Sequence, residues 1–209
     1  MMIHKKYLLI TASIVLIALL STLYFFYKRK SPEVLSIPAV GGRVEARFHF
    51  AESPIFLQTD SRWATQEIGG SREPLRAVGC TICSLSMALA HYDIEMTPDA
   101  LNEKLKAQEG FTEQGWLKWN KIASVTEQKI RVDIPTLSHE AIDHALKSQQ
   151  PVIAKILLNG SIQHWVLIVG KSGQEYLIKD PLGDGRSLEP LSKFGSDIFA
   201  IRVVAKNNA

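Results

Sequence analysis

Cysteine is scarce in this sequence of 209 residues, which contains only Cys80 and Cys83. Two thiols three positions apart do not build the disulfide framework of a small secreted domain, and they fit an oxidising or a reducing compartment equally well. Metal ligands at zinc-site spacing are too few, so we expect no metal. The formal net charge is only +3, and basic residues form no stripe interleaved with aromatics. Nucleic acid therefore has no support as a partner.

Charged side chains are missing altogether from residues 7–27. A helix of that length would reach roughly 31 Å at about 1.5 Å per residue, which is the thickness of the hydrocarbon core of a bilayer. Tyrosines stand at both ends of the run and basic residues flank it, as is typical of membrane spans. A cleavable signal peptide would have a shorter apolar region and a small-x-small cleavage site, which this run lacks. We therefore expect an uncleaved transmembrane anchor.

Basic residues are nearly balanced on the two sides of this span, so they do not decide its orientation. A single N-terminal anchor usually leaves its domain outside the cytoplasm, and we expect the same here. Proline and glycine punctuate the chain after the span, and residues 43–50 alternate like a strand at a sheet edge. The predicted organisation is an anchor with basic flanks at 1–30, a linker or arm at 31–52 and a globular domain at 53–209.

Helical patterns come first in the predicted domain, and strand patterns follow. Apolar residues recur at helical spacing after Cys80, while Thr97 and Ser138 are suitable N-caps for two later helices. The second half contains β-rich runs separated by glycine-containing turns. This segregation indicates an α+β fold with an antiparallel sheet. The expected helices cover 82–92, 97–107, 116–127 and 139–148, and the expected strands cover 152–158, 163–170, 175–180 and 199–205.

Three reactive side chains have positions that suit thiol chemistry. Cys80 opens a helix, His164 begins a strand and Asp180 ends the next strand. A thiol is nucleophilic as the thiolate, which a helix N-terminus and a nearby imidazolium both favour. The 16 residues from His164 to Asp180 suit two antiparallel strands joined by a turn, with both side chains at one sheet edge.

Four segments resemble those of the bacteriocin-processing peptidases that remove double-glycine leaders, a family of the papain-like superfamily. The first has a cysteine at the head of a helix, then small residues, then Leu85-Ser86-Met87. The second and third are the histidine strand and the Asp-Pro strand end. The fourth lies upstream and resembles the segment that carries the oxyanion-hole glutamine. In this sequence they are residues 79–87, 164–170, 178–183 and 57–63.

This resemblance implies a papain-like cysteine proteinase fold and a peptide or protein substrate. Cys80 would be the nucleophile, and His164 would hold the thiolate as an ion pair and protonate the leaving group. Asp180 would orient the imidazole. Gln58 would stabilise the oxyanion together with the backbone N–H of Cys80. Such chemistry needs no cofactor, and we expect a stand-alone, membrane-anchored form.

Two departures from the family pattern leave alternatives open. Thr81 stands where a glycine is common, and Cys83 stands where a small residue is usual and could be mistaken for the nucleophile. The same fold and triad would also serve an acyl- or peptidyl-transferase. A C-x-x-C thiol-disulfide oxidoreductase is a further alternative, but it requires a strand just before the motif. An inactive binding module with the same fold is the last.

Overall fold

The computed structural model describes residues 19, 21, 35–50 and 54–207. It divides into two compact units, Met1–Leu35 and Ser36–Ala209, of which the second is described below. Among the described residues no helix is long and apolar enough to cross a membrane. The predicted anchor lies outside the described residues, apart from Leu19 and Ser21, and stays a prediction.

An antiparallel sheet of six strands forms one side of this unit. Its path is β1-β4-β3-β6-β2, and the short β5 pairs with β4. All of these pairings are antiparallel, which confirms the predicted combination of helices and an antiparallel sheet. The strands are β1 Val40–His49, β2 Ile130–Asp133, β3 Val152–Leu158, β4 Ile162–Lys179, β5 Glu189–Pro190 and β6 Ala200–Lys206.

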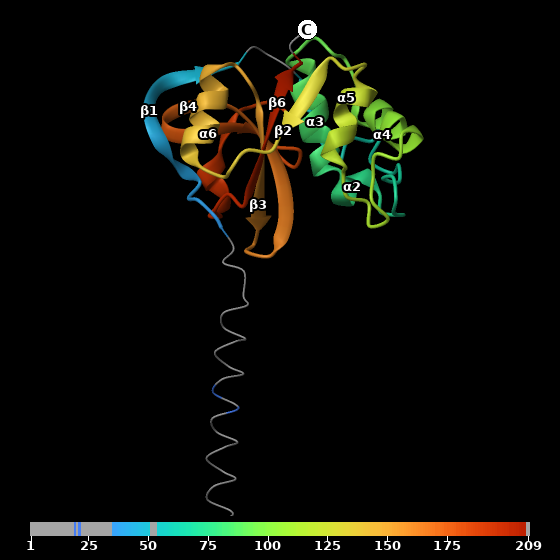
Figure 1. The fold of residues 1–209 in the computed structure, drawn as a ribbon, viewed down its shortest axis with the longest axis horizontal. Coiled ribbons are helices and arrows are strands. Elements are labelled where there is room, and N and C mark those ends of the chain that lie inside the picture. The colour runs from blue at the N-terminus through green and yellow to red at the C-terminus, as the bar shows by residue number, and fades with distance from the viewer. Residues whose placement is uncertain (1–18, 20, 22–34, 51–53, 208–209) are drawn as a thin grey trace, which may run out of the picture. The chain divides into compact units, whose positions relative to one another are not determined.

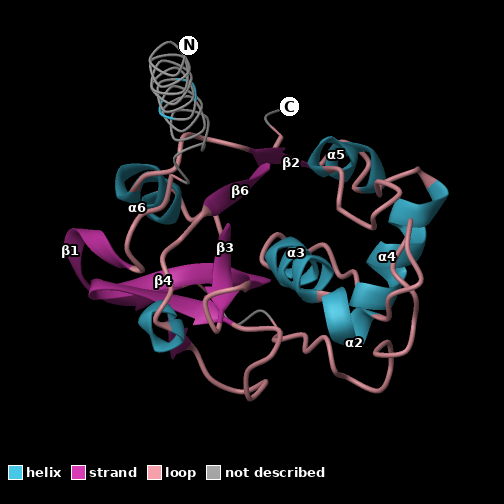
Figure 2. Ribbon diagram, turned by 90° about the horizontal axis from the view of Figure 1, so that it is seen from below, coloured by secondary structure: helices cyan, strands magenta, loops and turns pink. Residues whose placement is uncertain are grey.

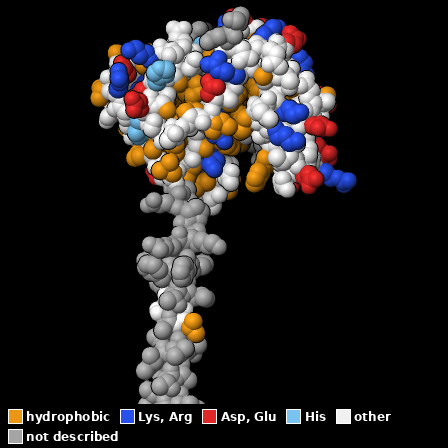
Figure 3. Space-filling view, in the orientation of Figure 1, with side chains coloured by type: hydrophobic (Ala, Val, Ile, Leu, Met, Phe, Trp, Pro, Cys, Tyr) orange, Lys and Arg blue, Asp and Glu red, His pale blue; other side chains and the backbone are white. Residues whose placement is uncertain are grey.

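The helices gather mainly on the other side of the unit (Figures 1 and 2). Helix α3 and the late helix α6 lie on opposite sides of β3 and β6. On the face drawn in Figure 3, acidic and basic side chains are mixed around a more apolar centre. The helices are α2 Leu75–Val78, α3 Cys80–Ala90, α4 Pro98–Ala107, α5 Ile122–Val125 and α6 His139–Lys147, with 3₁₀ turns η1 Trp119–Lys121 and η2 Leu191–Phe194.

The long helix predicted at 116–127 is wrong in its extent. Phe111 and Leu117 pair as an isolated β-bridge, and this extended backbone keeps Leu117 out of a helix. Helical structure therefore begins only at Trp119 and ends at Val125. A further short helix, α2, forms just before Cys80, where the sequence predicted no helix.

Strand β4 explains how the sheet gathers distant residues. An extended chain rises about 3.3 Å per residue, so 16 residues of straight strand would span roughly 53 Å. His164 and Asp180 are nevertheless hydrogen-bonded, so the segment between them reverses its direction. Gly173 has a φ of 60°, a conformation that glycine adopts without steric cost, within this reversing segment. The structure thus replaces the two predicted strands at 163–170 and 175–180 by one continuous element.

Helix α3 forms the centre of the core. Its residues from Ile82 to Leu89 are all buried, as expected of a helix that is apolar on every side. The hydroxyl of Ser84 donates a 3.1 Å hydrogen bond to the carbonyl oxygen of Trp165 in β4. Since Ser84 lies one turn after Cys80 and Trp165 follows His164, this bond fixes the helix N-terminus beside the histidine strand.

The predicted arm contributes to the sheet of the compact unit. Its strand-like pattern at 43–50 is confirmed, since β1 pairs with β4. A buried ion pair between Lys171 in β4 and Asp143 in α6 lies beneath it. Asp143 also accepts a hydrogen bond from the backbone N–H of Arg43. The arm is therefore held by both the sheet and helix α6.

Candidate active site

Cys80 is the first residue of helix α3. The preceding Gly79 lies so close to α2 that an added Cβ would stand 2.4 Å from the carbonyl oxygen of Leu75, the first residue of that helix. Only glycine permits this close approach, which lets α2 pass into α3 within one residue. The thiol of Cys80 is buried with 7% of the residue exposed. The predicted position of Cys80 at a helix N-terminus is confirmed.

His164 is oriented by Asp180. Its Nε2 atom lies 2.7 Å from Oδ1 of Asp180, and both side chains are buried. Burial alone would lower the pKa of His164, but the hydrogen bonds and charges of Asp180 and Cys80 raise it to about 9. Because Asp180 occupies Nε2, Nδ1 is the ring nitrogen left for the thiol. The imidazole therefore interacts with both the carboxylate and Cys80, the three residue types that a thiol–imidazole–acid triad uses.

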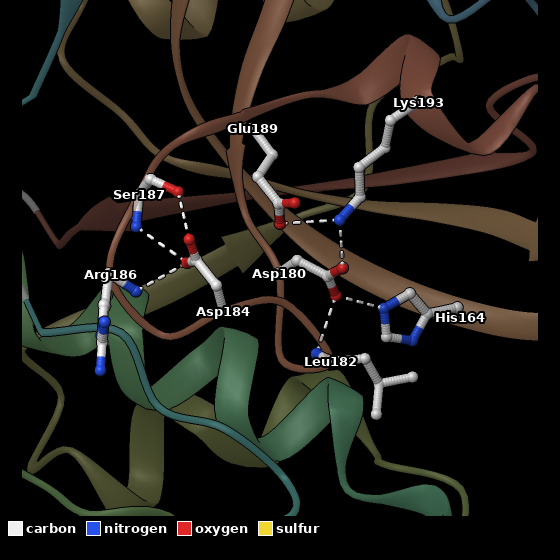
Figure 4. A network of polar contacts seen from close by, with 8 residues as sticks. All are labelled: His164, Asp180, Leu182, Asp184, Arg186, Ser187, Glu189 and Lys193. Carbon is white, nitrogen blue, oxygen red and sulfur yellow. Dashed lines mark hydrogen bonds and ion pairs between the residues drawn. The ribbon is translucent and has the colours of Figure 1, made fainter.

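Asp180 receives three donors, as Figure 4 shows. Besides His164, the backbone N–H of Leu182 donates to Oδ1 at 2.9 Å, and Nζ of Lys193 lies 2.8 Å from Oδ2. Burial favours the neutral acid, but these hydrogen bonds outweigh it and hold the pKa of Asp180 below its ordinary range. The carboxylate is consequently charged at neutral pH and can stabilise an imidazolium.

Gln58 is buried in the loop that runs alongside this site. Its backbone N–H donates a 2.9 Å hydrogen bond to the carbonyl oxygen of Pro181, directly after Asp180. Its side-chain Nε2 donates a 2.7 Å bond to the carbonyl oxygen of Arg76, four residues before Cys80. An amide nitrogen has two hydrogens, so one donor of Gln58 is left for another acceptor. The loop thus lies between the Asp-Pro turn and the approach to α3.

A buried tryptophan holds this loop. Trp63 is 1% exposed, and its Nε1 donates a 2.7 Å hydrogen bond to the carbonyl oxygen of Leu57, next to Gln58. Asp60 and Arg62, also in the resembling segment, form an exposed ion pair with each other. Trp63 therefore fixes the backbone next to Gln58 from within the same segment.

Cys83 has a different environment from Cys80. It is completely buried, and both cysteines are free. Burial raises the pKa of the Cys83 thiol far above its ordinary range, with the charges of Cys80 and Asp60 adding to the effect. Strand pairing in the described residues 54–79 is limited to the isolated bridge between Glu67 and Pro74. The C-x-x-C segment of this chain therefore lacks both the reactive second thiol and the preceding strand that a thiol-disulfide oxidoreductase requires.

The structure brings Cys80, His164 and Asp180 together and places the Gln58 loop against two of the same segments. Sequence reasoning missed Lys193, which has no motif around it and comes 13 residues after Asp180. A buried carboxylate with two oxygens to satisfy was the only available hint of such a partner. Within the described part of the chain, no group of three or more His, Cys, Asp or Glu side chains could hold a metal ion.

A helix-borne thiol and a histidine oriented by a carboxylate are features of the cysteine peptidases, and comparison with known proteins agrees. The sequence profile of the Peptidase C39 family matches residues 76–204. The chain therefore belongs to this family and is a cysteine peptidase, which confirms the resemblance to bacteriocin-processing peptidases.

Two individual proteins are similar to parts of the chain. The mesentericin transport/processing ATP-binding protein MesD of Leuconostoc mesenteroides is 26% identical over 103 residues, which are 49% of this chain and 13% of that protein. The chain thus spans only a small part of this relative. A solved structure of a C39-like peptidase from Bacillus anthracis is 18% identical, with a TM-score of 0.48 over 78% of this chain and all of that one.

Proposed function

We propose that this peptidase cleaves peptide bonds through Cys80, His164 and Asp180, with Gln58 as an oxyanion donor. The observation that carries the proposal is the shared imidazole. Asp180 takes one nitrogen of His164 at 2.7 Å, and the interaction with Cys80 contributes to raising the pKa of the same ring to about 9. An imidazolium that persists at neutral pH is the partner a thiolate needs.

The reaction would proceed through a thioester. The sulfur of Cys80 forms a bond to the substrate carbonyl carbon, and the resulting oxyanion accepts hydrogen bonds from Gln58 and the backbone N–H of Cys80. His164 transfers its proton to the departing amine as the C–N bond breaks. A water molecule then attacks the thioester carbonyl, gives a proton to His164 and releases Cys80 and the new carboxylic acid. Removing one oxyanion donor typically costs about 10²–10³ in rate.

The experiment is digestion of a mixed peptide library by the full chain in H₂¹⁸O, with the products identified by mass spectrometry. Wild type is compared with Cys80→Ser, and Cys83→Ser is the matched control on the same helix. Hydrolysis places one ¹⁸O in each new C-terminal carboxylate, and Cys80→Ser abolishes it while Cys83→Ser does not. Cleavage that survives Cys80→Ser, or that requires Cys83, would contradict the proposed nucleophile.

An acyl- or peptidyl-transferase would use the same thioester with another acceptor. Adding glycinamide to the same digestion separates the two activities, because a transferase forms amide products in preference to ¹⁸O-labelled acids. The peptidase and the transferase differ only in the acceptor, since the thiol and the imidazole act identically until the thioester has formed.

We also propose that residues 7–27 anchor the peptidase in a membrane, with the catalytic unit on the extracytoplasmic side. The uncharged 21-residue run supports this proposal, since its length matches a bilayer core. The anchored chain should remain with membranes during carbonate extraction, and a variant without residues 7–27 should be released. Release of both chains would contradict the anchor, and protection of the peptidase from protease added outside intact cells would contradict its orientation.

A further inference from the structure

The turn η2 (Leu191–Phe194) lies against the His164–Asp180 pair. Nζ of Lys193 lies 2.8 Å from Oδ2 of Asp180 and 2.7 Å from Oε2 of Glu189. The next residue, Phe194, presents its ring to that of His164 at 5.9 Å between centroids and 67° between planes. Two residues of this short turn thus contact Asp180 and His164, the members of the proposed triad that do not bond covalently to the substrate.

We infer that Lys193 is a positioning residue of the peptidase, which holds the Asp180 carboxylate in place for His164 and balances its charge. This inference rests on the proposed triad. It adds a cation and a second acid to that triad, so that the polar chain runs from Cys80 through His164, Asp180 and Lys193 to Glu189.

The positioning part follows from the two carboxylate oxygens. Oδ1 of Asp180 accepts hydrogen bonds from His164 and the backbone N–H of Leu182, and Oδ2 contacts Lys193 alone among the described residues. A carboxylate that is held at both oxygens cannot rotate about its Cβ–Cγ bond without breaking a charge-assisted hydrogen bond. Lys193 therefore keeps Oδ1 directed at the imidazole.

The electrostatic part follows from the sign of each charge. Lys193 places a positive charge on the far side of Asp180 from His164, so it opposes protonation of the imidazole while it favours ionisation of the carboxylate. Glu189 has the opposite effect, because it partly neutralises Lys193. The lysine is 26% exposed, and the ion pairs with Asp180 and Glu189 raise its pKa against the effect of burial. It is therefore charged at all pH values at which the triad works.

The backbone around the site is adapted to this arrangement. An added Cβ on Gly183 would stand 2.5 Å from Oε2 of Glu189, the same oxygen that contacts Lys193. Glycine at this position gives the Glu189 carboxylate room beside the Asp-Pro turn. The ammonium group of Lys193 also lies 4.6 Å from the centroid of the Phe194 ring, which favours a cation. Three independent contacts thus fix the lysine in its position.

The test measures the titration of His164 directly, in the full chain purified in detergent with isotopically labelled histidine. Ring resonances are assigned by comparison with His164→Gln. The variants are Lys193→Met, which removes the charge at similar size, and Lys193→Arg, which keeps it. Glu189→Gln removes the counter-charge. Lys129→Met is the matched control, because Lys129 belongs to an exposed ion pair with Glu127.

Lys193→Met should raise the pKa of His164, which corresponds to an acid dissociation constant about tenfold lower. The reason is that a positive charge that opposes protonation of the ring is lost. Lys193→Arg should restore the wild-type value, and Glu189→Gln should shift the titration in the opposite direction. At high pH the neutral ring of wild type should keep its proton on Nε2, whereas Lys193→Met should show both tautomers. A merely structural role for the turn would produce neither the opposite signs nor the rescue by arginine.

One result would overturn the inference while the proposed triad holds, and a different result would overturn the triad itself. If Asp180→Asn lowers the pKa of His164 but Lys193→Met and Glu189→Gln leave it as in Lys129→Met, the triad holds and the role of Lys193 is refuted. If Asp180→Asn also leaves the titration of His164 unchanged, the proposed function fails first. Should Lys193→Met not fold, the opposite shift expected of Glu189→Gln still decides the inference.

Discussion

The substitution Asp180→Asn isolates the electrostatic effect of the carboxylate in the proposed triad. It preserves the size of the side chain but removes the negative charge 2.7 Å from Nε2 of His164. A pKa raised from the ordinary value of 6.5 to about 9 corresponds to about 3 kcal/mol in favour of the imidazolium. Asp180 supplies the first of the interactions that raise it, while burial acts in the opposite direction. Without the charge, the pKa of His164 should fall to its ordinary value or below.

At pH 8 the loss of reactivity should be about thirtyfold, from the fraction of His164 that is protonated when its pKa is about 9 and when it is 6.5. At that pH the His164 ring of wild type is mostly protonated, whereas that of Asp180→Asn is mostly neutral. The population of the thiolate–imidazolium pair should fall by the same factor. The assay is peptide cleavage between pH 6 and 9, alongside titration of the His164 ring by NMR. An unchanged pKa of His164 in Asp180→Asn, or a rate within threefold of wild type at pH 8, would refute the reasoning.

The same substitution should change how stability depends on pH. The folded-state pKa of His164 is raised above its unfolded value, so this group stabilises the folded chain fully below about pH 6.5. The stabilisation is lost as the pH rises through about 9, and it amounts to up to about 3 kcal/mol. Urea unfolding at pH 6 and at pH 9 should therefore show a larger loss for wild type than for Asp180→Asn. Equal losses would contradict the linkage.

Two further predictions concern the packing that holds the site together, and both are checked by urea unfolding. Ser84→Ala should destabilise the chain by about 1 kcal/mol because it removes the bond between α3 and β4, whereas Ser86→Ala should be neutral or stabilising, since the buried Oγ of Ser86 has no partner among the described residues. Equal effects of the two would refute the role given to Ser84. Lys171→Met should cost about 3–5 kcal/mol because it leaves Asp143 as an uncompensated buried charge, against at most about 0.5 kcal/mol for the exposed Lys129→Met. A loss for Lys171→Met as small as that of Lys129→Met would show that the pair is not buried in solution.

Local signals predicted where two of the helices begin. Ser138 caps α6 by accepting a 3.1 Å hydrogen bond from the backbone N–H of Ala141, and Pro98 is the first residue of α4. Both helices begin where the sequence placed them, because caps act within one turn. The order of Cys80, His164 and the acid was equally readable from the chain.

The unpredicted features depend on contacts that local propensity does not encode. Strand β4 stays continuous through the predicted reversal while it pairs with β1, and the bridge between Phe111 and Leu117 removes helix before Trp119. Lys193 is similar, because nothing near it in the sequence indicates that η2 folds back onto Asp180. The arm was predicted to pair with a sheet edge, but its attachment through Asp143 required the structure.

The most direct measurement is labelling of the full chain with limiting iodoacetamide between pH 5 and 9, with the modified residue located by mass spectrometry. An ordinary thiol has a pKa of about 8.5 and reacts slowly at pH 6.5. Our account predicts fast labelling of Cys80 at pH 6.5, slowed by His164→Ala and unaffected by Cys83→Ala. Labelling of Cys80 only above about pH 8, or labelling that is indifferent to His164→Ala, would contradict the activated thiol on which the proposed mechanism depends.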